Sequence, residues 1–202
     1  MTRSPRSAAR SGPPERVVAV IDLAGFVADL KDHAVEHGFH VHDERHFVES
    51  YSLRQNWEVD LHPEEGCEGP VDLYLSLEVE PRVLLGFEDA VIAGDGFEDP
   101  PDDYFLPLSF TWALPPLPQA PDLLVLATEL AAVGGPDLPL EVSAIDSYPS
   151  ATDAPETSLR VVAHQRVSLL RIRDGEEVPC ETLDRCLGVS RFLLEQAGGW
   201  LG

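Results

Sequence analysis

The chain has 202 residues, of which 44% are hydrophobic, and its 36 acidic and 14 basic residues give a formal net charge of −22. A chain of this length suits one medium-sized domain, and this hydrophobic content is enough to build a core. The acidic excess excludes simple nucleic-acid binding, which needs a basic surface against phosphates, and it disfavours contact with anionic lipids. A protein partner with a basic surface would instead be attracted.

The first residues and the cysteines predict a cytoplasmic protein. Residues 1–13 carry arginines but lack the apolar segment of a secretory signal, and no apolar run approaches the roughly 18–20 residues of a membrane span. The three cysteines have no CxxC spacing, which argues against a disulfide framework and against a zinc ribbon. Lys31 is the only lysine among the 14 basic residues, a bias typical of a high-GC bacterial genome.

In chain order, residues 1–13 are predicted to be disordered, because they lack apolar periodicity. Apolar residues at spacings of three and four predict an amphipathic helix over residues 14–38, although residues 17–21 also fit a short strand. A strand is predicted over Phe47–Leu61. The alternation in "VDLYLSLEV", residues 71–79, predicts a second strand that pairs with it as a hairpin.

Arg82–Ile92 is predicted to be a third strand. Residues 93–120 are rich in proline and acidic residues, and we expect an irregular insertion there that contains one more short strand. Pro121–Gly134 is predicted to be a helix, with proline in its first turn and glycines that end it.

The last part of the chain is predicted to form two strands and a helix. The strands are "LPLEVSAIDSY", residues 138–148, and Leu159–Ile172, where a slip in the alternation near Ser168–Leu170 predicts a bulge. The helix is Pro179–Ala197. Because most turns between strands are too short for parallel crossovers, residues 14–202 are predicted to be a single α+β domain with a mainly antiparallel sheet and three helices, in the order α-β-β-β(-β)-α-β-β-α.

The element order resembles that of the secretion-chaperone-like fold shared by type III secretion chaperones and the YbjN-like family. The closest stretches are "RVVAHQRVSLL" and "CETLDRCLGVSRFLLEQ", a final strand that leads into a closing helix. The resemblance covers roughly residues 20–198 and implies a small, acidic, non-enzymatic cytoplasmic protein. The insertion at 93–120 departs from the compact pattern of those families.

Five of the seven histidines lie between Lys31 and Phe47. His33 and His37 share a face of a helix, and His40 and His42 share a face of a strand. Neutral imidazoles bind zinc and other divalent transition metals, so these four residues are the candidate metal ligands. The alternative is structural: His37 lies in the last turn of the helix, where a partly protonated imidazole stabilises the helix dipole, and the strand histidines face solvent.

Two other groups are candidate sites for chemistry. Arg160, His164 and Arg166 form a compact basic group on one face of a predicted strand and are the candidate anion-binding residues. The alternative is that they pair with carboxylates of neighbouring strands. His62 and Cys67 could form a nucleophile and its base, but the acidic residues around them oppose thiolate formation. No catalytic residue is assigned.

The aromatic residues Phe105, Phe110 and Trp112 are the candidate partner-binding residues, because exposed aromatic side chains contribute much of the binding energy at protein interfaces. They could instead cover the core. With no catalytic motif, the sequence favours a non-enzymatic, chaperone-like or adaptor-like module that binds another protein, and that could form a homodimer. The alternative is a metal-dependent enzyme or metal-binding protein that uses the histidines at 33–46.

Overall fold

The computed structural model describes residues 21–202 except residues 95–98, 149, 151–154 and 178, and the tail predicted to be disordered, residues 1–13, lies outside the described residues. The elements, in chain order, are α1 (Leu23–Glu36), β1 (Phe39–Val48), β2 (Gln55–Pro63), the 3₁₀ turn η1 (Glu64–Gly66), β3 (Asp72–Val79), α2 (Pro81–Ala93), β4 (Phe105–Ala113), α3 (Leu123–Gly134), β5 (Leu140–Ser147), β6 (Glu156–Ser168), α4 (Leu169–Asp174) and α5 (Cys180–Leu201).

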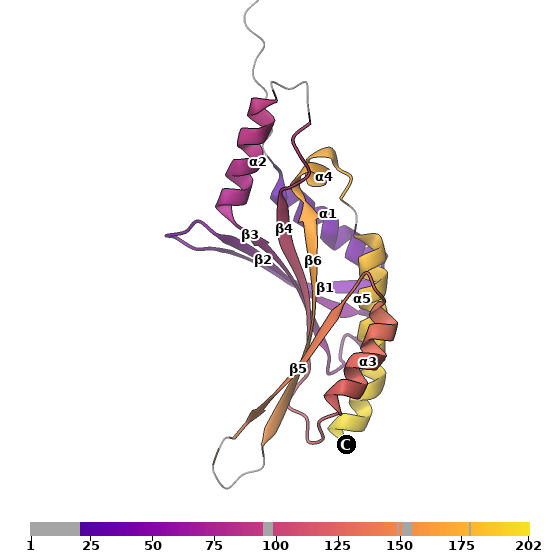
Figure 1. The fold of residues 1–202 in the computed structure, drawn as a ribbon. Helices are drawn as coiled ribbons and strands as arrows, with labels where there is room; N and C mark the ends of the chain where they lie inside the picture. Colours follow the sequence, from indigo (N-terminus) through magenta and orange to yellow (C-terminus); the bar gives the residue numbers. More distant parts are fainter. Residues whose placement is uncertain (1–20, 95–98, 149, 151–154, 178) are drawn as a thin grey trace, which may run out of the picture.

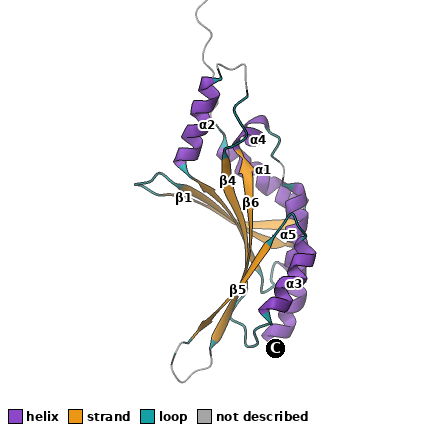
Figure 2. Ribbon diagram, in the orientation of Figure 1, coloured by secondary structure: helices purple, strands orange, loops and turns teal. Residues whose placement is uncertain are grey.

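The strands form one six-stranded antiparallel sheet in the order β1-β2-β3-β4-β6-β5. Helices α1, α3 and α5 gather on one side of this sheet, whereas α2 lies apart at one end (Figures 1 and 2). The other face of the sheet is open over most of its area. The predicted α+β class with a mainly antiparallel sheet is therefore confirmed.

The core lies between the sheet and the helices α1, α3 and α5. Alternate residues of β2, β3, β4 and β6 point into it, which is the period-two pattern of strands with one buried face. Its one buried polar pair among the described residues joins β4 to α5, where the indole N–H of Trp112 donates a hydrogen bond to Ser190 Oγ over 2.8 Å. Both side chains are fully buried, so the bond fixes the position of α5 on the sheet.

The predicted strand at Arg82–Ile92 is wrong, because these residues belong to the helix α2. Pro81 occupies the first turn, where its missing N–H costs nothing. An apolar residue recurs every four positions, at Val83, Phe87 and Val91, which is a helical spacing. The β-branched residues of this segment favour a strand and so hide that spacing.

The prediction of an irregular insertion at 93–120 is also wrong for its second half. Residues 105–113 form β4, a central strand that pairs with β3 on one side and β6 on the other. Pro107 is tolerated because pairing with β3 ends at Leu108, so no ladder hydrogen bond with β3 is lost there. Leu106, Leu108, Phe110 and Trp112 are buried, and the residues between them face away from the core.

Three smaller predictions also need correction. A turn over residues 49–54 divides the predicted strand Phe47–Leu61 between β1 and β2. The predicted bulge near Ser168–Leu170 is the start of α4, whose first turn is capped by the Ser168 hydroxyl accepting from Arg171 N. The described residues contain five helices, α1 to α5, where three were predicted.

Other boundaries follow from local chemistry. The first helix begins at Leu23, because the Asp22 carboxylate accepts a hydrogen bond from Gly25 N over 2.8 Å as an N-cap. It ends before Gly38, whose φ of +85° is a left-handed conformation that glycine adopts without strain. Within the described residues, no helix combines the length and the apolar character needed to cross a bilayer.

Candidate functional site

The open face of the sheet is polar and divided by charge. Glu58 and Asp60 of β2 and Glu78 of β3 lie on it and make its β2–β3 half acidic, whereas the even-numbered residues of β6 bring positive charge to the other half. The Tyr74 hydroxyl lies at the acidic half, and partial burial, together with the charges of Asp72 and Asp60, raises its pKa. On this face the negative and the positive side chains are therefore separated into two halves and are not interspersed.

The structure places the three predicted anion-binding residues, Arg160, His164 and Arg166, together on this face of β6. Arg160 donates a long hydrogen bond of 3.4 Å to Thr111 Oγ1, and the guanidinium of Arg166 lies 4.1 Å from the centre of the Phe105 ring. Neither arginine forms an ion pair with a carboxylate among the described residues. Among the described residues, these two positive charges are therefore not neutralised by a carboxylate.

The predicted partner-binding aromatic residues do not form an exposed group. Phe110 and Trp112 are fully buried on the helix-covered face, which corrects the expectation that they are accessible to a partner. Phe105 is half-buried under Arg166. Phe110 and Trp112 therefore agree with the alternative interpretation, in which these aromatic residues fill the core.

A different apolar surface lies at the tip of the β1–β2 hairpin, which projects beyond the rest of the sheet (Figure 1). The exposed fraction is 49% for Phe47 and 60% for Leu53, Val48 is more than half exposed, and Tyr51 is fully exposed. We call these four residues the hairpin tip. Leu53 has a φ of +58°, a left-handed conformation that a leucine rarely adopts.

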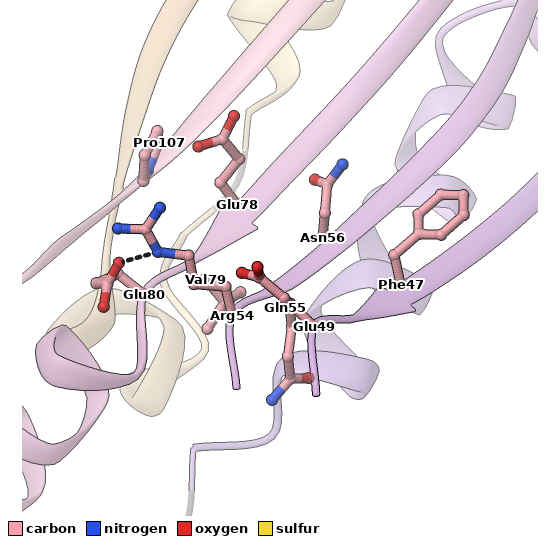
Figure 3. A pocket seen from close by; sticks show the side chains of 9 residues that line it. All are labelled: Phe47, Glu49, Arg54, Gln55, Asn56, Glu78, Val79, Glu80 and Pro107. Carbon is pink, nitrogen blue, oxygen red and sulfur yellow. Dashed lines mark hydrogen bonds and ion pairs between the residues drawn. The ribbon is translucent and has the colours of Figure 1, made fainter. Parts of the chain in front are cut away.

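A pocket of about 410 Å³ adjoins the hairpin tip on the open face. Its lining comes from β1, β2, β3 and β4 and from the turn residues beside them (Figure 3). Phe47, Asn56 and Glu78 lie side by side on β1, β2 and β3, with Pro107 of β4 beyond them. Arg54 reaches from the hairpin to Glu80, and its Nε donates to Glu80 Oε2 over 2.6 Å (Figure 3). The pocket is thus apolar at its Phe47 and Pro107 ends and acidic between them.

The predicted metal ligands separate into two pairs. His37 Nδ1 lies 2.6 Å from Asp184 Oδ1 of α5, and His33 Nδ1 lies 4.0 Å from Cys180 Sγ. These two histidines therefore contact α5 and not the strand histidines. Their contacts agree with the structural interpretation of the helical pair.

The strand histidines, in contrast, meet a cysteine. His40 and His42 of β1 lie with Cys67, which follows η1, and one potential ligand atom of each residue lies within 4.8 Å of the others. His40 Nδ1 is 2.8 Å from Cys67 Sγ. Cys67 therefore contacts His40, and not His62, the residue considered in the sequence as a possible base for it. All three cysteines are free thiols.

A fourth imidazole, that of His62, lies against this cluster. Its ring centre is 4.5 Å from that of His42, and the residue is 92% buried, with 8% of its surface exposed. His62 Nε2 lies 3.2 Å from Asp60 Oδ1 and 3.6 Å from Asp72 Oδ1. His62 Nδ1 is buried with no hydrogen-bond partner among the described residues.

Sequence reasoning found His40 and His42 but missed Cys67 as their neighbour and missed the hairpin tip. Cys67 is 27 positions from His40, so only the register of β1 on β2 and the geometry of η1 reveal the contact. The hairpin tip has one signal in the sequence: Tyr51 and Leu53 stand among polar residues at 49–54, where the structure has a turn within the predicted strand Phe47–Leu61.

Comparisons of the chain with protein-family models, with curated proteins and with solved structures found no match. The resemblance to secretion-chaperone-like proteins therefore stays a prediction, and function has to be inferred from the surfaces described above.

Proposed function

We propose that the protein is a non-enzymatic binding module that docks another protein through the hairpin tip and the adjoining open face. The observation that supports this proposal is the group of four large apolar side chains exposed together on one projecting hairpin. Adjacent exposed apolar residues mark interaction surfaces more often than single ones do, and tyrosine is enriched among the residues that dominate binding energy.

The conformation of Leu53 also supports a role in binding. A branched side chain in the left-handed region costs on the order of 1 kcal/mol, and here the side chain gains little burial in return. Glycine or asparagine would fit the same turn with less strain. A leucine at this position is explained if its side chain is buried by a partner.

The acidic residues beside the hairpin tip define the kind of partner. Glu49, Glu78 and Glu80 line the pocket, in a chain whose net charge is −22. An apolar segment flanked by arginine or lysine would complement this arrangement. Charge attraction of this kind raises the association rate and weakens with salt. An adaptor or a chaperone for a basic client fits these properties.

The test compares a variant of the hairpin tip with a control variant on the opposite edge of the sheet. The double variant Tyr51→Ser with Leu53→Asn removes apolar surface from the hairpin tip, and Ile145→Ser removes it from β5, the opposite edge strand. Each tagged protein is recovered from its native cells at low salt after chemical crosslinking, and bound proteins are quantified by mass spectrometry. We expect one stoichiometric partner with the wild type and Ile145→Ser, and its loss with the double variant. Equal recovery by all three proteins, or no partner for the wild type, would contradict the proposal.

A further inference from the structure

We propose that His40, His42 and Cys67 bind a transition-metal ion of the zinc class, at a site that is separate from the hairpin tip. The three side chains come from two segments, the first residues of β1 and the turn after η1, and their potential ligand atoms lie within 4.8 Å of one another. Donors in a tetrahedral zinc site lie roughly 3.3–3.8 Å apart, so small side-chain rotations would place these three around one ion.

A break in strand register lies within the donor set. Val41 pairs with Leu61 and Asp43 pairs with Asp60, so His42 is the extra residue of a β-bulge. Residues two apart on a strand share a face without a bulge, so His40 and His42 lie together by strand geometry, and the bulge bends β1 locally at His42. Bulges of this kind often lie next to functional sites, where they redirect one side chain.

The turn that carries Cys67 is held in place on both sides. Glu64 N donates a hydrogen bond of 3.0 Å to Gly38 O, which ties η1 to the start of β1. On the other side, a Cβ atom at Gly69 would lie 2.6 Å from Leu194 Cδ2 and 2.9 Å from Gly66 O, so glycine allows the turn to pack against α5. Cys67 is therefore positioned by the fold and is not on a free loop.

His62 is an independent indication of a ligand. His62 Nε2 lies near Oδ1 of Asp60 and Oδ1 of Asp72 without forming a hydrogen bond to either, and both His62 Nδ1 and Asp60 Oδ1 are buried with no hydrogen-bond partner among the described residues. Buried polar atoms without a partner destabilise the fold unless a water or an ion contacts them. His62 thus carries an unpaired buried nitrogen beside His42, whose ring centre is 4.5 Å away, and it is not itself one of the three proposed ligands.

The donor set selects the class of metal. Two imidazole nitrogens and one thiolate favour zinc and its transition-metal neighbours over magnesium and calcium, which prefer oxygen. Glu64 Oε1 lies 3.9 Å from His40 Nε2 and adds negative charge beside the donors. A hydrogen bond between His40 and Cys67 alone would explain that one contact, but it would not explain why a ring nitrogen of His42 also lies within 4.8 Å of the donor atoms of both residues.

The first experiment is a metal titration of the full chain purified without a polyhistidine tag. Zn²⁺ binding is measured by calorimetry, and Co²⁺ binding by the charge-transfer absorption of a cobalt–thiolate bond. We expect about one equivalent bound with that absorption, as for a site with a cysteine ligand. Cys67→Ser should abolish the absorption and weaken zinc binding at least about tenfold, the lower end of the loss seen when only a ligand's hydrogen-bond partner is removed.

Two variants serve as matched controls. Cys180→Ser removes a thiol that also lies 4.0 Å from a histidine, and His164→Ala removes an exposed histidine of β6. Both should keep the stoichiometry, the affinity and the absorption of the wild type. A control variant that loses binding as much as Cys67→Ser, or a Cys67→Ser protein that binds as the wild type does, would overturn the proposal.

A second measurement needs no variant. Zn²⁺ should slow the alkylation of Cys67 at least about tenfold and leave that of Cys180 in the same molecules unchanged, because a metal-bound thiolate is a poor nucleophile. Equal protection of both thiols, or protection of neither, would count against the site. The hairpin-tip double variant should still bind zinc, so a failure of this proposal and a failure of the proposed partner binding can be told apart.

Discussion

The helix-covered face and the open face of the sheet differ in how strongly the burial of apolar area constrains their residues. On the helix-covered face, β4 presents Leu108, Phe110 and Trp112, and each is fully or almost fully buried. On the open face, the same strand presents Ser109 and Thr111, which are only partly covered. The residues of the covered face follow from the need to bury apolar area, whereas burial does not determine those of the open face and of the hairpin tip. Function is therefore best sought on the open side.

The largest expected difference between the faces is at two adjacent residues of β4. Phe110→Ala should lower the free energy of unfolding by about 3–5 kcal/mol, because it leaves a cavity in the core. Ser109→Ala should change it by no more than about 0.5 kcal/mol. Urea denaturation followed by circular dichroism measures both. A similar loss for both variants would mean that the open face is covered in solution.

A second comparison uses the same substitution on each face. Ser190→Ala should cost about 1–3 kcal/mol, because it leaves the buried indole N–H of Trp112 without an acceptor. Ser76→Ala removes the hydroxyl that donates to Asn56 Oδ1 over 2.7 Å on the open face, and water can replace it there. We expect a loss of about 1 kcal/mol or less from chemical denaturation of this variant. A larger loss for Ser76→Ala would reverse the ranking.

The covered face should also produce a pH dependence through Cys186. Burial raises the pKa of this thiol well above its usual value of 9.0. The folded chain therefore keeps the proton at pH values at which the unfolded chain releases it, so the free energy of unfolding should fall as the pH rises above about 9, by up to 1.4 kcal/mol per pH unit from this group. Thermal or urea melts at stepped pH measure the slope.

Cys186→Ala should make this slope shallower. Val189→Ala, at another fully buried position of α5, should lower stability at every pH and keep the slope of the wild type. Identical slopes for Cys186→Ala and the wild type would show that the thiol does not contribute.

The smallest expected effect concerns the hairpin tip. Leu53→Asn should leave stability unchanged or raise it by up to about 1 kcal/mol, because asparagine adopts the left-handed conformation more easily than leucine does. Differential scanning calorimetry is sensitive enough to detect the shift in Tm. Val59→Ala, on the same strand pair but in the core, should instead lower Tm clearly. A clear loss of stability in Leu53→Asn would mean that this leucine serves the fold.

Much of the fold could be predicted, because burial imposes regular patterns on the sequence. The pairing of β2 with β3 and the helices α3 and α5 were predicted from alternation, proline and glycine, and the structure confirms them. The helix α2 was missed because its β-branched residues resemble a strand. The strand β4 was missed because Pro107 argued against a central position in the sheet. The apolar residues on both sides of Pro107 nevertheless alternate with other residues, as in a strand with one buried face.

The candidate metal site could be predicted only in part. The shared face of His40 and His42 follows from strand geometry, but the contact with Cys67 depends on a bulge and a turn that no local pattern encodes. The acidic composition predicts that the proposed partner is basic, which stays a prediction. It gave no position for the contact, because the hairpin tip is defined by which apolar residues the fold leaves uncovered.

The attachment of α2 has a consequence for dynamics. Phe87 is the one fully buried residue of this helix, and its ring meets Tyr104 edge-on at 5.7 Å, whereas Val83, Leu84 and Val91 pack against the core only partly buried. A segment held by so little buried area can open without disrupting the core, so its amide hydrogens should exchange with solvent much faster than those of β3 and β4 on either side of it in the chain. Such a helix could also rearrange when the neighbouring sheet face is occupied, since its local unfolding requires only a small part of the global free energy.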